Sequence, residues 1–158
     1  MIRGIHHVSV HVHDLPRMLK FYSEAFGFEI VGEEFNWRDS DLIDRIMDEP
    51  GSAGRGAMLR AGTCYMELFQ FDAPDPSSTR PLRPSDKGYT HFCVDVTDIE
   101  QEVERLRSLG MIFGDRTPVD AGHVKTLYGR DPEGNVIEIQ QTERHCDFRL
   151  DKLPPART

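Results

Sequence analysis

The sequence predicts an α+β fold built from two βαβββ modules, because a single pattern occurs twice along the chain of 158 residues. The two copies are HHVSVHVHDLPRMLKFYSEAFGF, which starts at His6, and THFCVDVTDIEQEVERLRSLGMIF, which starts at Thr90. In each copy an alternating segment, with His7 and His91 at matching positions, leads into a segment of helical periodicity, and a later apolar strand carries one Glu. A repeat of this kind indicates two related modules rather than one irregular domain.

The first module is expected to open with a strand and a helix. Val8, Val10 and Val12 alternate with polar residues, which is the pattern of a half-buried strand. Asp14 is a suitable N-cap for the helix that follows, and Gly27 is suited to end it. The apolar stripe of this helix consists of Leu15, Met18, Leu19, Tyr22 and Phe26.

The second module repeats the arrangement, with Phe92, Val94 and Val96 forming the alternating face of its first strand. Thr97 and Glu100 have the spacing of a capping box at the start of the next helix. The apolar stripe of this helix consists of Ile99, Val103, Leu106 and Leu109, and Gly110 follows it.

Each module then ends on a strand with one acidic residue. CYMELFQF carries Glu67, and NVIEIQQ carries Glu138 after the turn sequence DPEGN. The first module also holds a longer, partly helical insertion, FNWRDSDLIDRIMDEPGSAGRG, and the linker APDPSSTRPLRPSDKG separates the copies. We therefore expect one domain over residues 1–142, with modules 4–72 and 88–142, and a C-terminal extension over 143–158.

Composition narrows the class of protein. The net charge of −8 argues against a nucleic-acid partner, and no apolar stretch is long enough to span a membrane. The N-terminus lacks the apolar core of a signal peptide. Cys64, Cys93 and Cys146 are odd in number and form no CxxC pair, which favours free thiols in a reducing cytoplasm.

Four residues at matching points of the repeat indicate a metal site: His7 and Glu67 in the first module, His91 and Glu138 in the second. An acid flanked by apolar strand residues, as in MELF and VIEI, is costly to bury unless it is paired or bound to a metal. Two imidazoles and two carboxylates suit one divalent Zn, Ni, Co, Mn or Fe ion. His6 points to the opposite strand face and is the weaker candidate ligand, whereas His11 shares the face of His7 and could line a pocket.

The chain resembles the vicinal oxygen chelate superfamily over roughly residues 4–142. The segments that carry the resemblance are GIHHVSVHVHDLPRMLKFYSEAFGFEIV, YMELFQF, GYTHFCVDVTDIE and RDPEGNVIEIQQ. The resemblance implies a glyoxalase-like fold, in which the two modules curl into an open, U-shaped barrel around a metal that two substrate oxygens chelate. Within the superfamily, the ligand set is most similar to glyoxalase I. The loop DAGHVKTLY is similar to a segment of methylmalonyl-CoA epimerase and implies that His123 and Lys125 contact substrate.

From this resemblance we expect a metal-dependent lyase or isomerase that removes a proton next to a metal-chelated carbonyl and passes through an enolate. Glu67 and Glu138 are both candidates for the catalytic base. Trp37 and Arg38, with Phe35, are expected to contact a small-molecule substrate. A homodimer is expected, and the barrel can close within one chain or between two.

Two alternatives are open at this point. The first is an Fe(II) extradiol-type ring-cleaving dioxygenase with His7, His91 and Glu138 as its metal triad. The second is a metal-free protein that binds a small molecule.

Overall fold

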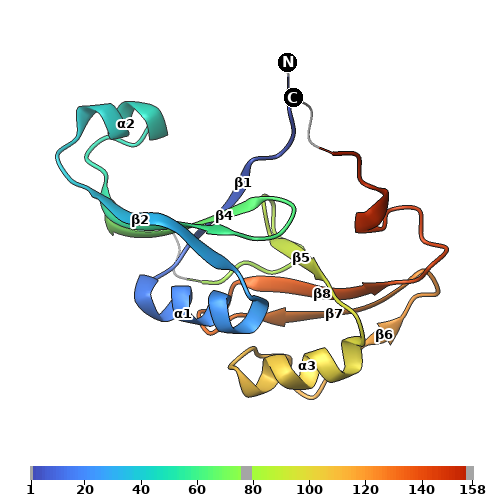
Figure 1. Ribbon diagram of the computed structural model, residues 1–158. Coiled ribbons are helices and arrows are strands. Elements are labelled where there is room, and N and C mark those ends of the chain that lie inside the picture. Colours follow the sequence, from blue (N-terminus) through green and yellow to red (C-terminus); the bar gives the residue numbers. More distant parts are fainter. Residues whose placement is uncertain (1, 76–79, 156–158) are drawn as a thin grey trace. The chain divides into compact units, whose positions relative to one another are not determined.

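A computed structural model describes residues 2–75 and 80–155 of the chain, which divides into two compact units, residues 1–79 and 80–158. Residues 76–79 of the expected linker and the last three residues of the expected extension lie outside the described residues. Each unit has the element order βαβββ, with one additional short helix in the first and a short 3-10 helix after the last strand of the second (Figure 1). The predicted α+β class and the duplicated module are therefore confirmed.

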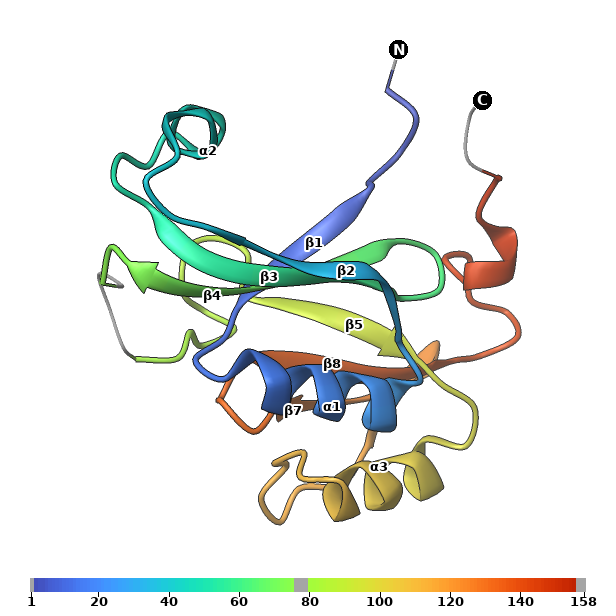
Figure 2. The same cartoon turned by 60° about the vertical axis from the view of Figure 1, so that its left-hand side comes forward.

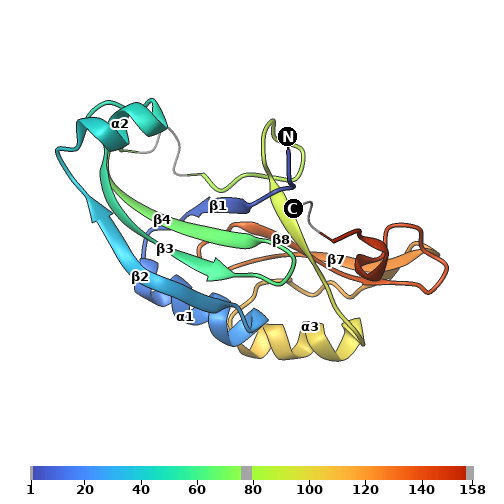
Figure 3. The ribbon, with the colours of Figure 1, turned by 45° about the horizontal axis from the view of Figure 1, so that its top comes forward.

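Unit 1 contains the strands β1 (His7–His11), β2 (Glu29–Trp37), β3 (Ala53–Arg60) and β4 (Tyr65–Ala73). The sheet order is β1-β4-β3-β2, with β1 parallel to β4 and the other pairs antiparallel (Figure 3). The first and last strands of the module, β1 and β4, are thus neighbours, with β1 at the edge of the sheet. This pairing sets a residue of β1 beside a residue of β4.

The helix α1 (Leu15–Phe26) begins and ends where its sequence signals predict. The Asp14 side chain accepts a hydrogen bond from the Arg17 backbone N–H, and Gly27 adopts the left-handed conformation at φ 67°. The helix buries its apolar stripe, and Gln70 of β4 accepts a hydrogen bond from the Leu15 N–H at 3.0 Å. The expected insertion contains the short helix α2 (Asp41–Met47), which has no buried residue.

Unit 2 repeats this topology with β5 (His91–Asp95), β6 (Val119–Asp120), β7 (Val124–Arg130) and β8 (Val136–Thr142), in the order β5-β8-β7-β6. The helix α3 (Ile99–Ser108) lies on one face of this sheet (Figure 2). Ile99, Val103 and Leu106 are buried on the helix, and Ile137 and Ile139 are buried on β8. These residues form the core of the unit.

The predicted capping box at the start of α3 is wrong. Asp98 is the N-cap, at φ 55°, and its side chain accepts from the Gln101 backbone N–H. Asp is among the few residues other than Gly that tolerate the left-handed backbone. Asp is also preferred over Thr as an N-cap, so Asp98 takes this position rather than Thr97. Unit 2 also tethers its helix to its last strand as unit 1 does, since Gln141 accepts from the Ile99 N–H at 2.9 Å.

The segment after β8 leads into a short 3-10 helix (Leu150–Lys152). Cys146, which lies between β8 and this helix, is buried. Lys152 donates a hydrogen bond to the Cys146 carbonyl oxygen at 2.8 Å. None of the helices in the described part of the chain combines the length and the apolar character that a membrane crossing requires.

Candidate metal centre

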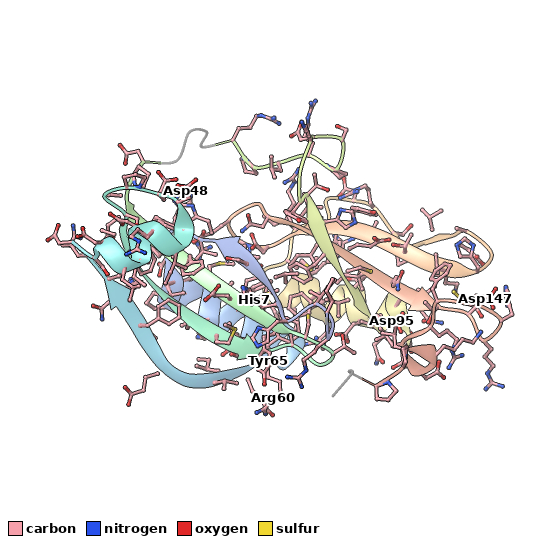
Figure 4. The ribbon with its side chains drawn as sticks, turned by 90° about the horizontal axis from the view of Figure 1, so that it is seen from above. His7, Asp48, Arg60, Tyr65, Asp95 and Asp147 are labelled. Carbon is pink, nitrogen blue, oxygen red and sulfur yellow. The ribbon has the colours of Figure 1, made fainter. Side chains whose placement is uncertain are left out.

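The first predicted pair, His7 and Glu67, lies on neighbouring strands of unit 1. The Nε2 atom of His7 is 3.4 Å from a carboxylate oxygen of Glu67. The parallel register pairs His7 with Tyr65, so Glu67 stands one pleat further along β4, opposite Ser9. Figure 4 shows His7 beside Tyr65 and Arg60, at the end of the unit far from Asp48 of the insertion.

The second predicted pair has the same geometry in unit 2. The Nε2 atom of His91 is 3.5 Å from a carboxylate oxygen of Glu138. His91 pairs in register with Val136, and Cys93 pairs with Glu138. The repeat seen in the sequence therefore extends to the distance between the imidazole nitrogen and the carboxylate oxygen.

This spacing fits two ligands of one metal ion. Ligand bonds of about 2.1 Å at tetrahedral angles separate the two donor atoms by about 3.4 Å, as in both pairs. A charge-assisted hydrogen bond between imidazole and carboxylate would bring the atoms to about 2.8 Å. Within neither unit do the described residues gather three or more His, Cys, Asp or Glu side chains suited to one ion.

The other nitrogen of each imidazole also has a partner. Nδ1 of His7 lies 3.0 Å from Nδ1 of His6, and Nδ1 of His91 lies 3.1 Å from the Thr90 hydroxyl. A partner at Nδ1 fixes the orientation of the ring and leaves Nε2 directed at the glutamate, which is the usual support of a histidine ligand. His6 also stacks on the Tyr65 ring, and this contact keeps it beside the first pair.

Hydrogen-bond donors surround the carboxylate of Glu138. Thr126 of β7 donates its hydroxyl to Glu138 at 2.6 Å, and the hydroxyl of Tyr128 lies 3.2 Å from Nε2 of His91. Burial, followed by the hydrogen bond to Glu138, raises the pKa of Tyr128 to about 12. Burial, followed by the charge of Glu138, likewise raises the pKa of Cys93 to about 12. Both groups therefore keep their protons at neutral pH and act as donors toward Glu138.

Glu67 has a different environment although its exposure is similar. Its side chain is 16% exposed against 15% for Glu138. The register places Met58 across from Glu67 where unit 2 has Tyr128, and Gly56 where unit 2 has Thr126. Burial is the largest influence on Glu67 and raises its pKa, against the opposing effects of His7 and His6. Glu67 is thus a half-buried carboxylate without a hydroxyl partner among the described residues.

The structure places the two predicted substrate residues of the first module at the end of β2. Trp37 is 7% exposed and donates its Nε1–H to the Ser52 hydroxyl at 2.9 Å. Its ring contacts Phe69 and Phe71 of β4. Arg38 is exposed and pairs with Asp72 at 2.9 Å.

The two predicted substrate residues of the second module lie away from the His91–Glu138 pair. Lys125 forms an ion pair with Glu100 at 2.9 Å, beside the first turn of α3. On β7 it alternates with Thr126, so its side chain leaves the opposite sheet face from the one that contacts Glu138. His123 lies before β7, exposed, with its ring against Phe148. This placement argues against contact between Lys125 and a ligand held by Glu138.

The sequence interpretation missed Thr126 and Tyr128. A signal was present, because the tight turn DPEGN fixes the register of β7 and β8 with Arg130 opposite Val136. Counting back from the turn puts Tyr128 opposite Glu138 and Thr126 one pleat beyond. An open groove of about 590 Å³ borders both residues, and Arg116, Thr117 and Pro84 line another part of it.

The chain belongs to the Glyoxalase/Bleomycin resistance protein/Dioxygenase superfamily, whose model matches residues 4–139. A curated relative, a 2-epi-5-epi-valiolone epimerase from Actinomyces sp, is 31% identical over 86% of this chain and 78% of its own length. A lactoylglutathione lyase from Schizosaccharomyces pombe is 27% identical over 85% of this chain, which spans only 46% of that relative.

Solved structures agree on the fold. A glyoxalase family protein from Bacillus cereus superimposes with a TM-score of 0.76 and 23% identity, covering 90% of this chain and 95% of its own. A mutant of a genomically encoded fosfomycin resistance protein from Listeria monocytogenes, complexed with Mn(II) and 1S,2S-dihydroxypropylphosphonic acid, gives a TM-score of 0.58 at 14% identity, covering 94% and 100%. That member of the fold therefore binds a divalent metal together with a small molecule.

Proposed function

We propose that the protein is a divalent-metal-dependent lyase or isomerase that removes a proton next to a carbonyl group of a small-molecule substrate. The observation that carries the proposal is the matched geometry of the two pairs, at 3.4 Å for His7–Glu67 and 3.5 Å for His91–Glu138. We propose that these four residues hold one Zn, Ni, Co, Mn or Fe ion. The relatives named as an epimerase and as a lyase, and the Mn(II) in the Listeria protein, support this class.

The metal would supply Lewis acidity, which polarises a carbonyl oxygen and stabilises negative charge as the neighbouring proton leaves. The chain itself must supply the base. A base needs a carboxylate that is free to move toward the substrate and is not already saturated with hydrogen-bond donors. Glu67 meets this condition better than Glu138, because Thr126 and Tyr128 hold the Glu138 carboxylate in place.

We therefore assign the base to Glu67 and treat Glu138 as the ligand with the fixed position. Trp37 remains a proposed substrate contact through the aromatic side chains it touches. Arg38 and His123 are proposed as contacts at the edge of the substrate. Lys125 is the weakest of the four candidate substrate contacts, because it is paired with Glu100.

Homodimerisation and a cytoplasmic location also remain proposals. Cys64, Cys93 and Cys146 are free thiols, and a reducing compartment keeps thiols in that state. The partner of the protein is a small molecule with two adjacent oxygens, as the superfamily resemblance implies.

The test is exchange of a substrate proton with solvent. The metal-loaded protein is incubated under nitrogen in D₂O with a panel of 2-oxo acids, 2-hydroxyketones and hemithioacetals, and proton NMR follows each compound. We expect loss of the signal next to the carbonyl for at least one class, and no loss after treatment with a chelator. A reaction that requires O₂ and Fe(II) and opens a ring would instead identify a dioxygenase. Binding that is unaffected by the chelator and produces no exchange would identify a metal-free binding protein.

A further inference from the structure

Four aromatic side chains gather on one sheet face of unit 1. Phe35 and Trp37 belong to β2, and Phe69 and Phe71 belong to β4; together they are called the aromatic wall. Ring centroids are 5.8 Å apart for Phe35–Phe69, 5.5 Å for Trp37–Phe69 and 5.3 Å for Trp37–Phe71, each with the rings nearly perpendicular. Edge-to-face contacts of this kind fix the rings in a defined arrangement.

The strand between β2 and β4 has no side chains at the points where these rings meet. A Cβ at Gly56 would lie 2.7 Å from the Phe35 ring, and a Cβ at Gly54 would lie 2.9 Å from the Trp37 ring. Glycine within a strand weakens it and often marks the close approach of another group. The two glycines therefore allow rings from the flanking strands to lie over β3 and contact one another.

The wall is not fully covered. Phe35 is 38% exposed, and Phe69 and Phe71 are half-buried, whereas Trp37 is 7% exposed and forms the back of the group. Aromatic rings placed for core packing alone would be buried like Tyr22 of α1, which is 0% exposed. The wall thus leaves part of its apolar ring surface exposed.

The wall is continuous with the first His–Glu pair. Glu67, Phe69 and Phe71 alternate along β4 and so leave the same sheet face. Phe69 is one pleat, about 7 Å along the strand, from Glu67. On the adjacent strand, His11 contacts the Phe71 ring at 5.2 Å, two pleats from His7. A six-membered ring is therefore about the size needed to reach from the His7–Glu67 pair to the wall.

We propose that the aromatic wall binds a flat, uncharged aromatic ring of the substrate, attached directly to one of the two adjacent carbons that carry the chelating oxygens. The proposal rests on the proposed function, because it takes the Glu67 carboxylate as the group that faces the reacting carbon. Ring edges and faces of the wall recognise another ring by the same perpendicular contacts that they make among themselves. The wall residues carry no charge, so they do not select for a charged substituent.

The chain offers a direct reporter, since Trp37 is its single tryptophan. The metal-loaded protein is titrated with mandelate and with lactate, which share a hydroxyl and a carboxylate on adjacent carbons and differ in a phenyl against a methyl group. Neither compound absorbs at the wavelength that excites tryptophan. We expect mandelate to bind at least about tenfold more tightly than lactate and to change the Trp37 fluorescence at saturation, since burying a ring contributes this much or more.

Two variants and one control complete the test. Phe69→Leu and Phe35→Leu are each expected to remove most of the preference for mandelate while leaving lactate affinity within about twofold. Phe28→Leu is the matched control: Phe28 is half-buried in unit 1 but stacks on Tyr22, away from the wall, so the preference should persist. Circular dichroism verifies that each variant is folded.

Equal affinities for the two acids, no binding of either, or a preference that survives both wall variants would overturn the inference. The proposed function is judged separately by its solvent-exchange experiment. Exchange on a non-aromatic compound together with equal affinities for mandelate and lactate would remove this inference and leave the proposed function standing.

Discussion

The two units share one backbone plan, but they surround their glutamates differently. In unit 2, Glu138 accepts a hydrogen bond from Thr126 at 2.6 Å, and Tyr128 and Cys93 also donate toward it. In unit 1, the corresponding strand positions hold Gly56 and Met58, neither of which has a donor in its side chain. The two glutamates therefore differ in their hydrogen-bond donors and not in their exposure to solvent, which is almost equal.

This difference is the basis for proposing different roles for Glu67 and Glu138. The His–Glu distance is common to both units, as required if both pairs bind the same kind of ion. The surroundings differ, and on this difference rests the proposal that Glu138 is the fixed ligand and Glu67 the base. Where unit 2 has the hydroxyl groups of Tyr128 and Thr126, unit 1 has Met58 and Gly56, and the Phe35 ring of the aromatic wall lies over Gly56.

The largest expected effect comes from replacing the two glutamates by glutamine. Glu67→Gln should lower the rate of proton exchange by about 10²–10⁴-fold while the protein keeps its metal, because an amide can still be a ligand but cannot accept the proton. Glu138→Gln should also keep its metal, and it should lower the rate far less than Glu67→Gln does, because Glu138 is proposed as a ligand and not as the base. Exchange rates and metal content are measured on both variants. If Glu138→Gln is the variant that loses the rate at full metal occupancy, the division of roles between the units is reversed.

Removing the donors around Glu138 should have an intermediate effect. Tyr128→Phe and Thr126→Val are each expected to weaken metal binding by about 10–100-fold, the usual consequence of losing a group that orients a ligand. Met58→Leu is the matched control, since Met58 faces Glu67 in the register that Tyr128 has with Glu138. Competition with a fluorescent chelator gives the affinities. A Met58 variant as weak as the Tyr128 variant would contradict the asymmetry.

The smallest effects concern the helix caps, whose backbones differ between the units. Asp14→Ala and Asp98→Ala should each lower the free energy of unfolding by about 1 kcal/mol, because each removes a side-chain cap. Asp98→Gly should cost only a few tenths of a kcal/mol, since the backbone there has φ 55°, which suits glycine. Urea denaturation measures all three. Equal losses for Asp98→Gly and Asp98→Ala would show that the backbone conformation is unimportant.

Much of the fold followed from local sequence patterns. The ends of α1 were predictable because Asp14 and Gly27 are strong signals at either end of an apolar stripe. The start of α3 was predicted wrongly, because Thr97, Asp98 and Glu100 offer competing caps and the left-handed backbone that decides between them is not visible in the sequence. The helical part of the insertion was expected, and α2 lies there.

The candidate site was predictable only in part, for a physical reason. Duplication singled out the two His–Glu pairs, because a matched position is unlikely to arise twice by chance. Thr126 and Tyr128 belong to one unit alone, so the repeat gave no indication of them, and only the strand register brings them to Glu138. The aromatic wall likewise depends on the two glycines of β3, whose role emerges when β2 and β4 are known to flank that strand.

The most direct test of the central claim is the metal content of the purified protein and of two variants, measured by inductively coupled plasma mass spectrometry. If one His–Glu pair from each unit holds a single ion, wild-type protein contains one divalent ion per chain. His7→Ala and His91→Ala, each missing one ligand, should both lose essentially all of it, while His145→Ala keeps it. Retention of about half the metal in either variant, from an initial content of two ions per chain, would show that each unit binds its own ion. Full retention in both would contradict the metal centre itself.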